Sequence, residues 1–263
     1  MKYQLIKPFL FLLAFVLVFG LACSVLAPST PVAQPAIPVA ESPVPPPPAT
    51  AVPVEVVSTT AAAAEPTQPP APPANSRFFT EEFDGDLSNW EYFHFGKDGS
   101  DYDVSTDDGL LVFEIKDEDT YVFNIYTAEK YDDVRIDTEA NNRGYNYNNV
   151  GLICRFDEDD GWYEFNISND GLYEIWAFDI LGDTGYNLIA NGGAQNIKTG
   201  KETNNYGIVC RGKTLTLYVN GREINSIEEN KYGFKRGYTG VSVSAENVIP
   251  IKVEFEWVKI SEP

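Results

Sequence analysis

The sequence predicts an all-β domain, a two-sheet antiparallel sandwich, over residues 77–263 of the 263-residue chain. Three observations support this fold class. From Phe78 onwards, apolar and polar residues alternate in short runs, as they do in strands that bury one face. Asp-Gly and Asn-Gly pairs separate these runs, and such pairs readily take the positive φ that tight hairpin turns need. No window long enough for a helix shows a helical period.

Residues 1–22 predict a signal peptide, because Lys2 and Lys7 precede an apolar run that ends at Ala22. That run is shorter than the roughly 20 residues of a membrane-spanning helix. The Gly-Leu-Ala-Cys sequence at 20–23 resembles a bacterial lipobox, which implies a lipid on Cys23. An ordinary signal followed by an incidental cysteine is the alternative. We expect an exported chain, lipid-anchored to the bacterial membrane and facing the cell exterior or the periplasm. The lipid would be its only membrane contact.

Residues 23–76 predict a disordered tether. Sixteen of the 18 prolines precede residue 76, and no aromatic residue occurs between Cys23 and Asn75. Such a segment lacks the apolar mass that offsets chain entropy, and its prolines favour extended polyproline II. The tether would hold the domain away from the membrane.

The domain itself contains about ten to twelve predicted strands. Val134 and Ile136, for example, alternate with Arg135 and Asp137. The clearest strands are residues 109–115, 121–127, 134–140, 151–157, 162–167, 172–178, 206–211, 215–220, 240–245 and 251–260. Hairpin turns are predicted at residues 159–161, 169–171 and 220–221.

The charge of the chain limits the classes of partner. The formal net charge is −20, and all but two of the 19 basic residues and all but three of the 39 acidic residues follow residue 76. Such a field repels nucleic-acid phosphates and anionic lipid headgroups. It suits neutral ligands, cations, or solubility outside a cell. We expect a monomeric domain that does not bind nucleic acid.

Several stretches resemble the concanavalin A-like jelly-roll superfamily, in its laminin-G-like branch. That branch includes 3-keto-disaccharide hydrolase domains and relatives of family 16 glycoside hydrolases. The stretches include residues 150–156, 162–167 and 255–260, and the segment 82–90 resembles the first strand of that fold. The most similar stretch is 210–221, a strand, turn, strand and Asn-Gly pattern. The resemblance covers residues 78–261 and implies a jelly roll, a fold that carries lectins, hydrolases and adhesion modules alike.

If the sheets pack as in that superfamily, one concave sheet face gathers aromatic and polar side chains. The expected members are Arg155, Trp162, Glu164, Asn166, Glu174 and Trp176. Indole rings stack on the C–H patches of a sugar, and the polar groups pair with its hydroxyls. We therefore predict a surface module that binds a neutral oligosaccharide or polysaccharide without catalysis. The alternative is that both tryptophans complete the core.

Catalysis is the weaker expectation. Family 16 enzymes carry a Glu-x-Asp-x-x-Glu strand, and in the nearest stretch, 158–164, Tyr163 stands where the second Glu belongs. We therefore expect no catalytic residues of that type. Glu164 and Glu174 on neighbouring strands keep a glycoside-active hydrolase of the 3-keto-disaccharide type open as an alternative. A protein-binding adhesion or scaffold domain is a second alternative.

Two further features bear on stability. Cys154 and Cys210 are an even pair in an exported domain, which is compatible with a disulfide or with two buried thiols. No cofactor is expected beyond a structural Ca²⁺, for which Asp84 and Asp86 near the first strand are candidate ligands. Solvated turn acids are the alternative. Residues 141–149 are rich in Asn and Tyr and form either a rim loop of the sugar site or simply a long loop.

Overall fold

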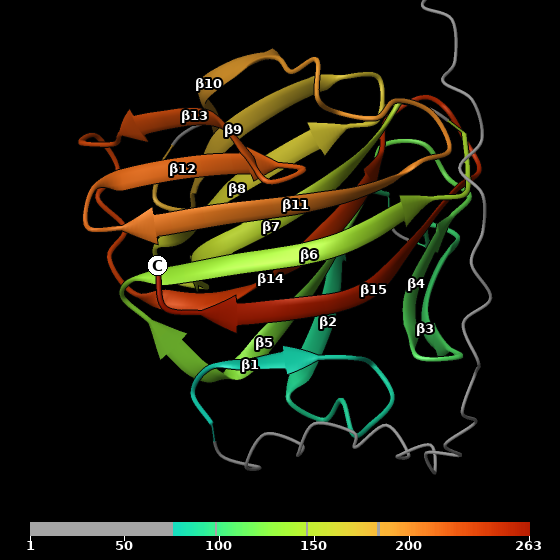
Figure 1. Ribbon diagram of the computed structural model, residues 1–263, viewed down its shortest axis with the longest axis horizontal. Coiled ribbons are helices and arrows are strands. Elements are labelled where there is room, and N and C mark those ends of the chain that lie inside the picture. Colours follow the sequence, from blue (N-terminus) through green and yellow to red (C-terminus); the bar gives the residue numbers. More distant parts are fainter. Residues whose placement is uncertain (1–75, 98, 146, 183–184) are drawn as a thin grey trace, which may run out of the picture. The chain divides into compact units, whose positions relative to one another are not determined.

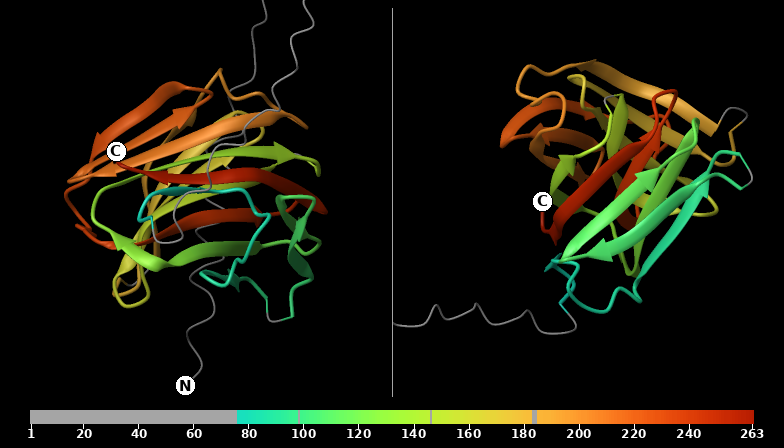
Figure 2. Two further views of the ribbon diagram at one scale, coloured as in Figure 1. Left: turned by 60° about the horizontal axis from the view of Figure 1, so that its bottom comes forward. Right: turned by 90° about the vertical axis from the view of Figure 1, so that its right-hand side faces the viewer.

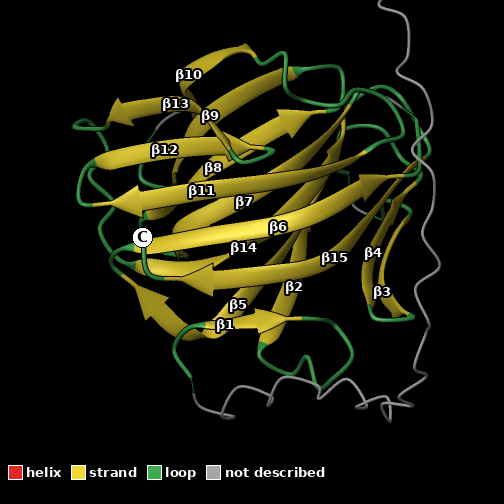
Figure 3. Ribbon diagram, viewed as in Figure 1, coloured by secondary structure: helices red, strands yellow, loops and turns green. Residues whose placement is uncertain are grey.

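The computed structural model describes residues 76–263 except 98, 146, 183 and 184 (Figure 1). The predicted signal peptide, Cys23 and nearly all of the tether lie outside these residues. Within the described part, no helix is long and apolar enough to span a bilayer. Figure 3 shows that this part consists of strands and loops.

Fifteen strands form two antiparallel sheets in the described part of the chain. In chain order they are β1 (Phe79–Glu81), β2 (Trp90–Phe95), β3 (Tyr102–Asp107), β4 (Leu110–Ile115), β5 (Thr120–Tyr131), β6 (Val134–Asn142), β7 (Asn148–Asp157), β8 (Gly161–Ser168), β9 (Leu172–Asp179), β10 (Gly185–Gly193), β11 (Thr203–Arg211), β12 (Thr214–Val219), β13 (Arg222–Glu228), β14 (Gly237–Ala245) and β15 (Ile251–Ser261).

The two sheets form the layers of a sandwich. The eight-stranded sheet has the order β13-β12-β11-β6-β15-β4-β3, with β1 paired to β15. The seven-stranded sheet has the order β10-β9-β8-β7-β14-β5-β2. Figure 1 looks through β11 and β6 of the first sheet onto β7 and β8 of the second, and Figure 2 shows the layers from two other sides. The predicted fold class is therefore confirmed.

The main core lies between the sheets, where the period of two places the apolar side chains. On β8, Tyr163, Phe165 and Ile167 are at most 1% exposed, and they face residues such as Ile208 of the other sheet. Burial of this face explains why the sequence alternates so regularly here. A disulfide joins Cys154 on β7 to Cys210 on β11, so it ties the two sheets together.

Five strands were not among the clearly predicted ones: β1, β2, β3, β10 and β13. Four of them, β2, β3, β10 and β13, are the edge strands of the two sheets. Edge strands bury less side-chain surface, so their sequences alternate less clearly. The expectation of a first strand within residues 82–90 is wrong, because β1 ends at Glu81 and β2 begins only at Trp90.

Candidate functional site

The outer face of the seven-stranded sheet, turned away from the other sheet, carries a pocket of about 520 Å³. We call it the outer-face pocket. The polar and aromatic residues that line it come from seven segments of the chain and are Phe95, Tyr121, Asn149, Asn166, Glu174, Trp176, Phe178, Tyr186 and Glu246. Three of the six residues predicted to contact sugar, Asn166, Glu174 and Trp176, are therefore brought together here.

Trp176 forms one wall of this pocket. It is partly exposed, and its indole nitrogen donates a hydrogen bond to Glu174 Oε2 at 3.1 Å. The ring of Tyr186 meets it edge-on, with ring centroids 6.1 Å apart. The indole is thus held in place by a carboxylate and a second ring while part of its surface still meets solvent.

Asn166 is the most informative polar group of the site. Only 8% of the residue is exposed, and its carbonyl oxygen Oδ1 has no hydrogen-bond partner. A buried polar atom without a partner costs about 1–3 kcal/mol, so such atoms are rare unless water or a ligand satisfies them. Because Asn166 lines the outer-face pocket, a ligand hydroxyl is a suitable partner.

Glu164 lies beneath the pocket instead of lining it. It is 1% exposed, and its carboxyl group accepts hydrogen bonds from Tyr186 Oη at 2.8 Å and Ser242 Oγ at 2.9 Å. Burial raises the pKa of Glu164 above its usual value, although these hydrogen bonds partly offset the effect. The expectation that this side chain meets a ligand directly is corrected: it supports Tyr186, which forms part of the wall.

Gly151 on β7 makes room for this arrangement. It pairs with Asn166 on one side and with Ser242 on the other. A Cβ atom at this position would lie 1.9 Å from Ser242 Oγ and 2.8 Å from Asn166 Oδ1. Only glycine therefore allows polar side chains of the two neighbouring strands to meet over β7.

Trp162 is a correction to the predicted site. It is 2% exposed and packs in a second apolar cluster on the outer face, stacked on Phe178 with ring centroids 4.1 Å apart. Phe95 of the edge strand β2 lies parallel to its ring at 6.0 Å. The rings of Phe123, Phe156 and Tyr186 also contact it, so side chains from five strands cover the indole.

Arg155 is a second correction, because it does not lie on the outer face with the other predicted residues. The register of β7 against β8 shifts after Cys154, and Arg155 has a positive φ of 58°. Through this bulge, Phe156 joins Ile153 in the outer aromatic cluster instead of sharing a face with Cys154. The guanidinium is buried and donates to three backbone carbonyl groups, those of Asp132, Gly212 and Phe234.

A structural calcium ion at Asp84 and Asp86 stays a prediction. Asp84 is exposed, and Asp86 accepts hydrogen bonds from the backbone N–H and the hydroxyl of Ser88, both at 2.9 Å. Among the residues that the structure describes, no three His, Cys, Asp or Glu side chains are grouped as metal ligands would be. Asp86 is therefore a turn residue in this structure.

The Asn/Tyr-rich segment contributes partly to the site. β6 extends to Asn142 and β7 begins at Asn148, so less of the segment is loop than its composition indicated. Tyr147 is 58% exposed and lines a smaller pocket of about 180 Å³. That pocket shares Asn166 and Glu174 with the outer-face pocket and so extends it along the sheet.

The buried Glu164 predicts a pH effect. Its raised pKa means that the folded state holds this proton more tightly than the unfolded state, so deprotonation destabilises the fold. We expect the variant Glu164→Gln to be more stable than the parent protein at pH 8. The difference in free energy of unfolding between the two proteins should disappear as pH falls below 4.5, the ordinary pKa of this carboxyl group. Urea unfolding at several pH values measures this free energy for the parent and the variant. Glu158→Gln, in an exposed turn, is the control and should show no such trend.

Comparison with solved structures gives the same fold. A protein of unknown function with a galectin-like fold from Bacillus subtilis is 11% identical, with a TM-score of 0.54 over 70% of this chain and 94% of that chain. Bacillus licheniformis beta-glucanase is 10% identical, with a TM-score of 0.51 over 71% and 98%. A glycoside hydrolase family 16 endo-glucanase from Bacteroides ovatus is 10% identical, with a TM-score of 0.51 over 70% and 99%. These likenesses confirm the predicted fold, a two-sheet β-sandwich.

Sequence comparison identifies the family more closely. A search of curated proteins gives no significant match. The family model of the 3-keto-alpha-glucoside-1,2-lyase-like domain, however, matches residues 79–260, which span β1 to β15. The chain therefore belongs to the 3-keto-alpha-glucoside-1,2-lyase-like domain family.

Proposed function

We propose that the outer-face pocket binds a neutral sugar and that the domain acts as a glycan-binding module. The observation that carries this proposal is the unpartnered, buried Oδ1 atom of Asn166 beside the partly exposed Trp176. Asn166 supplies a hydrogen-bond acceptor that needs a donor, and Trp176 supplies an apolar ring face. A pyranose offers both hydroxyl groups and C–H patches, so it complements this pair.

The rest of the pocket fits the same ligand class. Glu174 and Glu246 add acceptors and Asn149 adds an amide at the rim. Burial and the neighbouring Glu164 raise the pKa of Tyr186, so its phenol keeps its proton. None of these lining residues is basic, and an anionic ligand would therefore meet repulsion here. A neutral sugar is the better complement.

Replacing Trp176 by alanine tests the proposal. Loss of the stacking surface should weaken sugar binding about tenfold, since such ring contacts contribute on the order of 0.5–1.5 kcal/mol beyond area burial. A glycan array identifies the ligand, and calorimetry measures its affinity for the parent and the variant. Trp257→Ala is the matched control, because Trp257 is also partly buried but lies on β15 of the other sheet. Absence of binding to any neutral glycan would refute the proposal and favour a protein-binding adhesion module.

A second candidate function is enzymatic action on 3-keto-glucosides. Family membership and the buried Glu164 favour it, because the raised pKa of this residue makes it a potential proton donor directly beneath the pocket. Incubation with a 3-keto-disaccharide, followed by chromatography of the products, tests this function. Turnover that Glu164→Gln abolishes would establish catalysis. Binding without turnover would leave the module purely glycan-binding.

We also propose that the chain is an exported lipoprotein whose tether holds this domain off the membrane. The support is the sequence of residues 1–76, which combines a basic start, an apolar run, Cys23 and a proline-rich segment. Incorporation of a labelled fatty acid into the parent chain, but not into Cys23→Ala, is the expected result. Labelling of both chains alike would exclude Cys23 as the anchor.

A further inference from the structure

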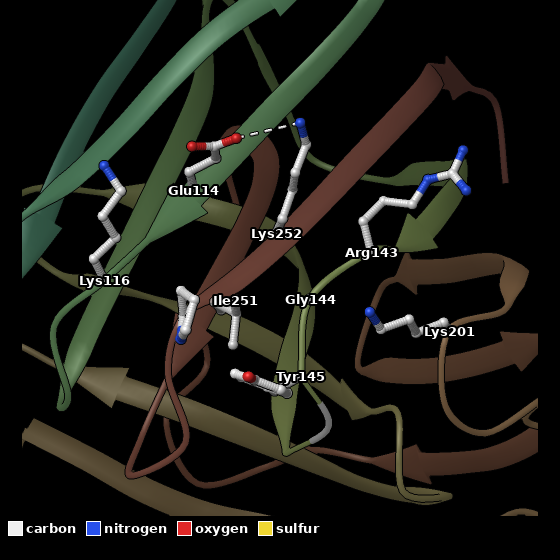
Figure 4. Close-up of a pocket in the computed structure, with 9 residues that line it drawn as sticks. Glu114, Lys116, Arg143, Gly144, Tyr145, Lys201, Ile251 and Lys252 are labelled. Carbon is white, nitrogen blue, oxygen red and sulfur yellow. Dashed lines mark ion pairs between the residues drawn. The ribbon is translucent and has the colours of Figure 1, made fainter.

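A second pocket, which we call the basic pocket, lies where the end of β4 meets the start of β15. Its volume is about 370 Å³. Four of its lining residues are basic, namely Lys116, Arg143, Lys201 and Lys252, and one is acidic, Glu114. Such a gathering is unusual in a chain with only 19 basic residues and a net charge of −20. Figure 4 shows that the four basic side chains come from separate segments around Tyr145 and Ile251.

Two of these cations are held by ion pairs. Arg143 Nε lies 2.7 Å from Glu254 Oε2, and Lys252 Nζ lies 3.2 Å from Glu114 Oε1. These pairs fix the two side chains at the margin of the pocket.

The other two cations remain available. Lys116 lies 3.6 Å from Asp101, but both side chains are more than half exposed, and pairs of this kind contribute little. Lys201 has no ion-pair partner within the described residues. Two ammonium groups can thus accept an anion without first breaking a strong contact.

The pocket also has an apolar part that is built in advance. Tyr145 is 56% exposed and lines it together with Pro250 and Ile251. The preceding segment is bound to β15, since the N–H groups of Arg143 and Gly144 both donate to the carbonyl of Lys252, at 2.8 and 3.0 Å.

Glycine is required at the contact between this segment and β15. A Cβ on Gly144 would lie 2.3 Å from the backbone nitrogen of Lys252. The backbone next to Tyr145 is therefore fixed before any ligand arrives.

We propose that the basic pocket binds an acidic sugar residue, one that carries a carboxylate or sulfate group. The anion contacts the ammonium group of Lys201, which lies on the same side of the pocket as Tyr145 in Figure 4, and the ring of Tyr145 packs against the C–H face of the sugar. Lys116 adds positive charge from the opposite side of the pocket. This site uses no residue of the outer-face pocket, so it stands independently of the function proposed there.

The rest of the domain argues against a long polyanion as the ligand. Outside this pocket the surface is dominated by acidic residues, which repel a chain of closely spaced phosphates. A sugar with a single anionic group is attracted by the cations of the pocket, and its neutral hydroxyls and C–H patches are not repelled by the acidic surface around it. The tyrosine ring adds a contact that a bare inorganic anion cannot use.

Calorimetry of the purified protein with a galacturonic acid trisaccharide tests the proposal, with its methyl ester as the uncharged counterpart. We expect binding of the acid form, weakening with added salt, and at least about tenfold weaker binding of the ester. A sulfated oligosaccharide is the second arm, and its tighter binding would identify sulfate as the preferred group. Inorganic sulfate alone should bind much more weakly than either sugar.

Three variants complete the experiment. Lys201→Glu should weaken binding of the acid trisaccharide about tenfold, because an attractive contact becomes repulsive. Tyr145→Ala should also weaken binding of the acid trisaccharide, because the ring contact is lost while the charge of the pocket is unchanged. Lys235→Glu makes the same charge change at an exposed position outside the pocket and should have little effect.

The opposite outcomes separate the two proposals. Equal binding of acid and ester, or equal loss with Lys201→Glu and Lys235→Glu, would overturn the basic pocket as the site. Loss of acid-sugar binding in Trp176→Ala would move the ligand to the outer-face pocket. Retained binding in that variant would leave the basic pocket standing even if no neutral sugar binds.

Discussion

Replacing Arg155 by alanine is expected to lower the free energy of unfolding by about 4 kcal/mol or more, since it removes three hydrogen bonds from a charged donor, each contributing about 1.5–3 kcal/mol. The residue is 3% exposed, and its three guanidinium nitrogens donate to the carbonyl groups of Asp132, Gly212 and Phe234 at 2.8–3.1 Å. These acceptors belong to three separate loops, so one side chain holds together the turns at this end of the sandwich. Burial lowers the pKa of Arg155, yet guanidinium remains charged at neutral pH.

Urea unfolding of the parent protein and two variants measures this effect. Arg155→Lys should recover little of the loss, because one ammonium group cannot reach three carbonyl groups in fixed directions. Arg135→Ala is the control: its side chain is about one third exposed and pairs with Asp137 on the outer face of the other sheet. Arg135→Ala should lower the free energy of unfolding by roughly 1 kcal/mol or less. An effect of Arg155→Ala as small as that of the control would show that the network does not stabilise the fold.

Removing the disulfide is expected to cost about 4 kcal/mol, the loop-entropy value for a crosslink between residues 56 positions apart. Cys154 and Cys210 are both fully buried and lie in different sheets, so the bond joins the layers through the core. In the double variant Cys154→Ala, Cys210→Ala, the unfolded chain regains the freedom that the bond removes. Its melting temperature should fall markedly.

Reduction provides the matching experiment. The parent protein in excess reductant should approach the stability of the double variant, while the variant itself should not respond to reductant. Cys23→Ala, which leaves both core cysteines in place, should unfold like the parent. A double variant as stable as the oxidised parent would show that sheet packing alone sets the stability.

The apolar pattern of the inner strands was readable because burial imposes it. On β8 and β9, the residues that alternate in sequence do separate between the inter-sheet core and the outer face, as Phe165 and Asn166 illustrate. The turns were readable for a similar reason: Asn220 and Gly221 both have positive φ, which few residue pairs tolerate. Local constraints of this kind leave their mark on neighbouring residues in the chain.

The candidate site was only half predictable. Asn166, Glu174 and Trp176 lie on two adjacent strands with clear periods, and they line one pocket. Tyr121 lies on β5, which β7 and β14 separate from β8, and Tyr186 lies on the edge strand β10 beside β9. Their meeting in this pocket depends on strand order, which periodicity does not encode. The small residue Gly151 in the middle of β7 was an available signal for polar side chains meeting above it.

By itself, the sequence determined the all-β class, the positions of the inner strands and their hairpin turns, because burial of one face and positive φ are local requirements. Only the tertiary structure decided which side chains reach solvent. Rings from five strands, among them Phe95 of the edge strand β2, cover Trp162, and the bulge at Arg155 turns that residue into the loops. Both depend on contacts between segments far apart in the chain, so no period of two could reveal them. The basic pocket arises in the same way, from four cations that meet only after the chain has folded.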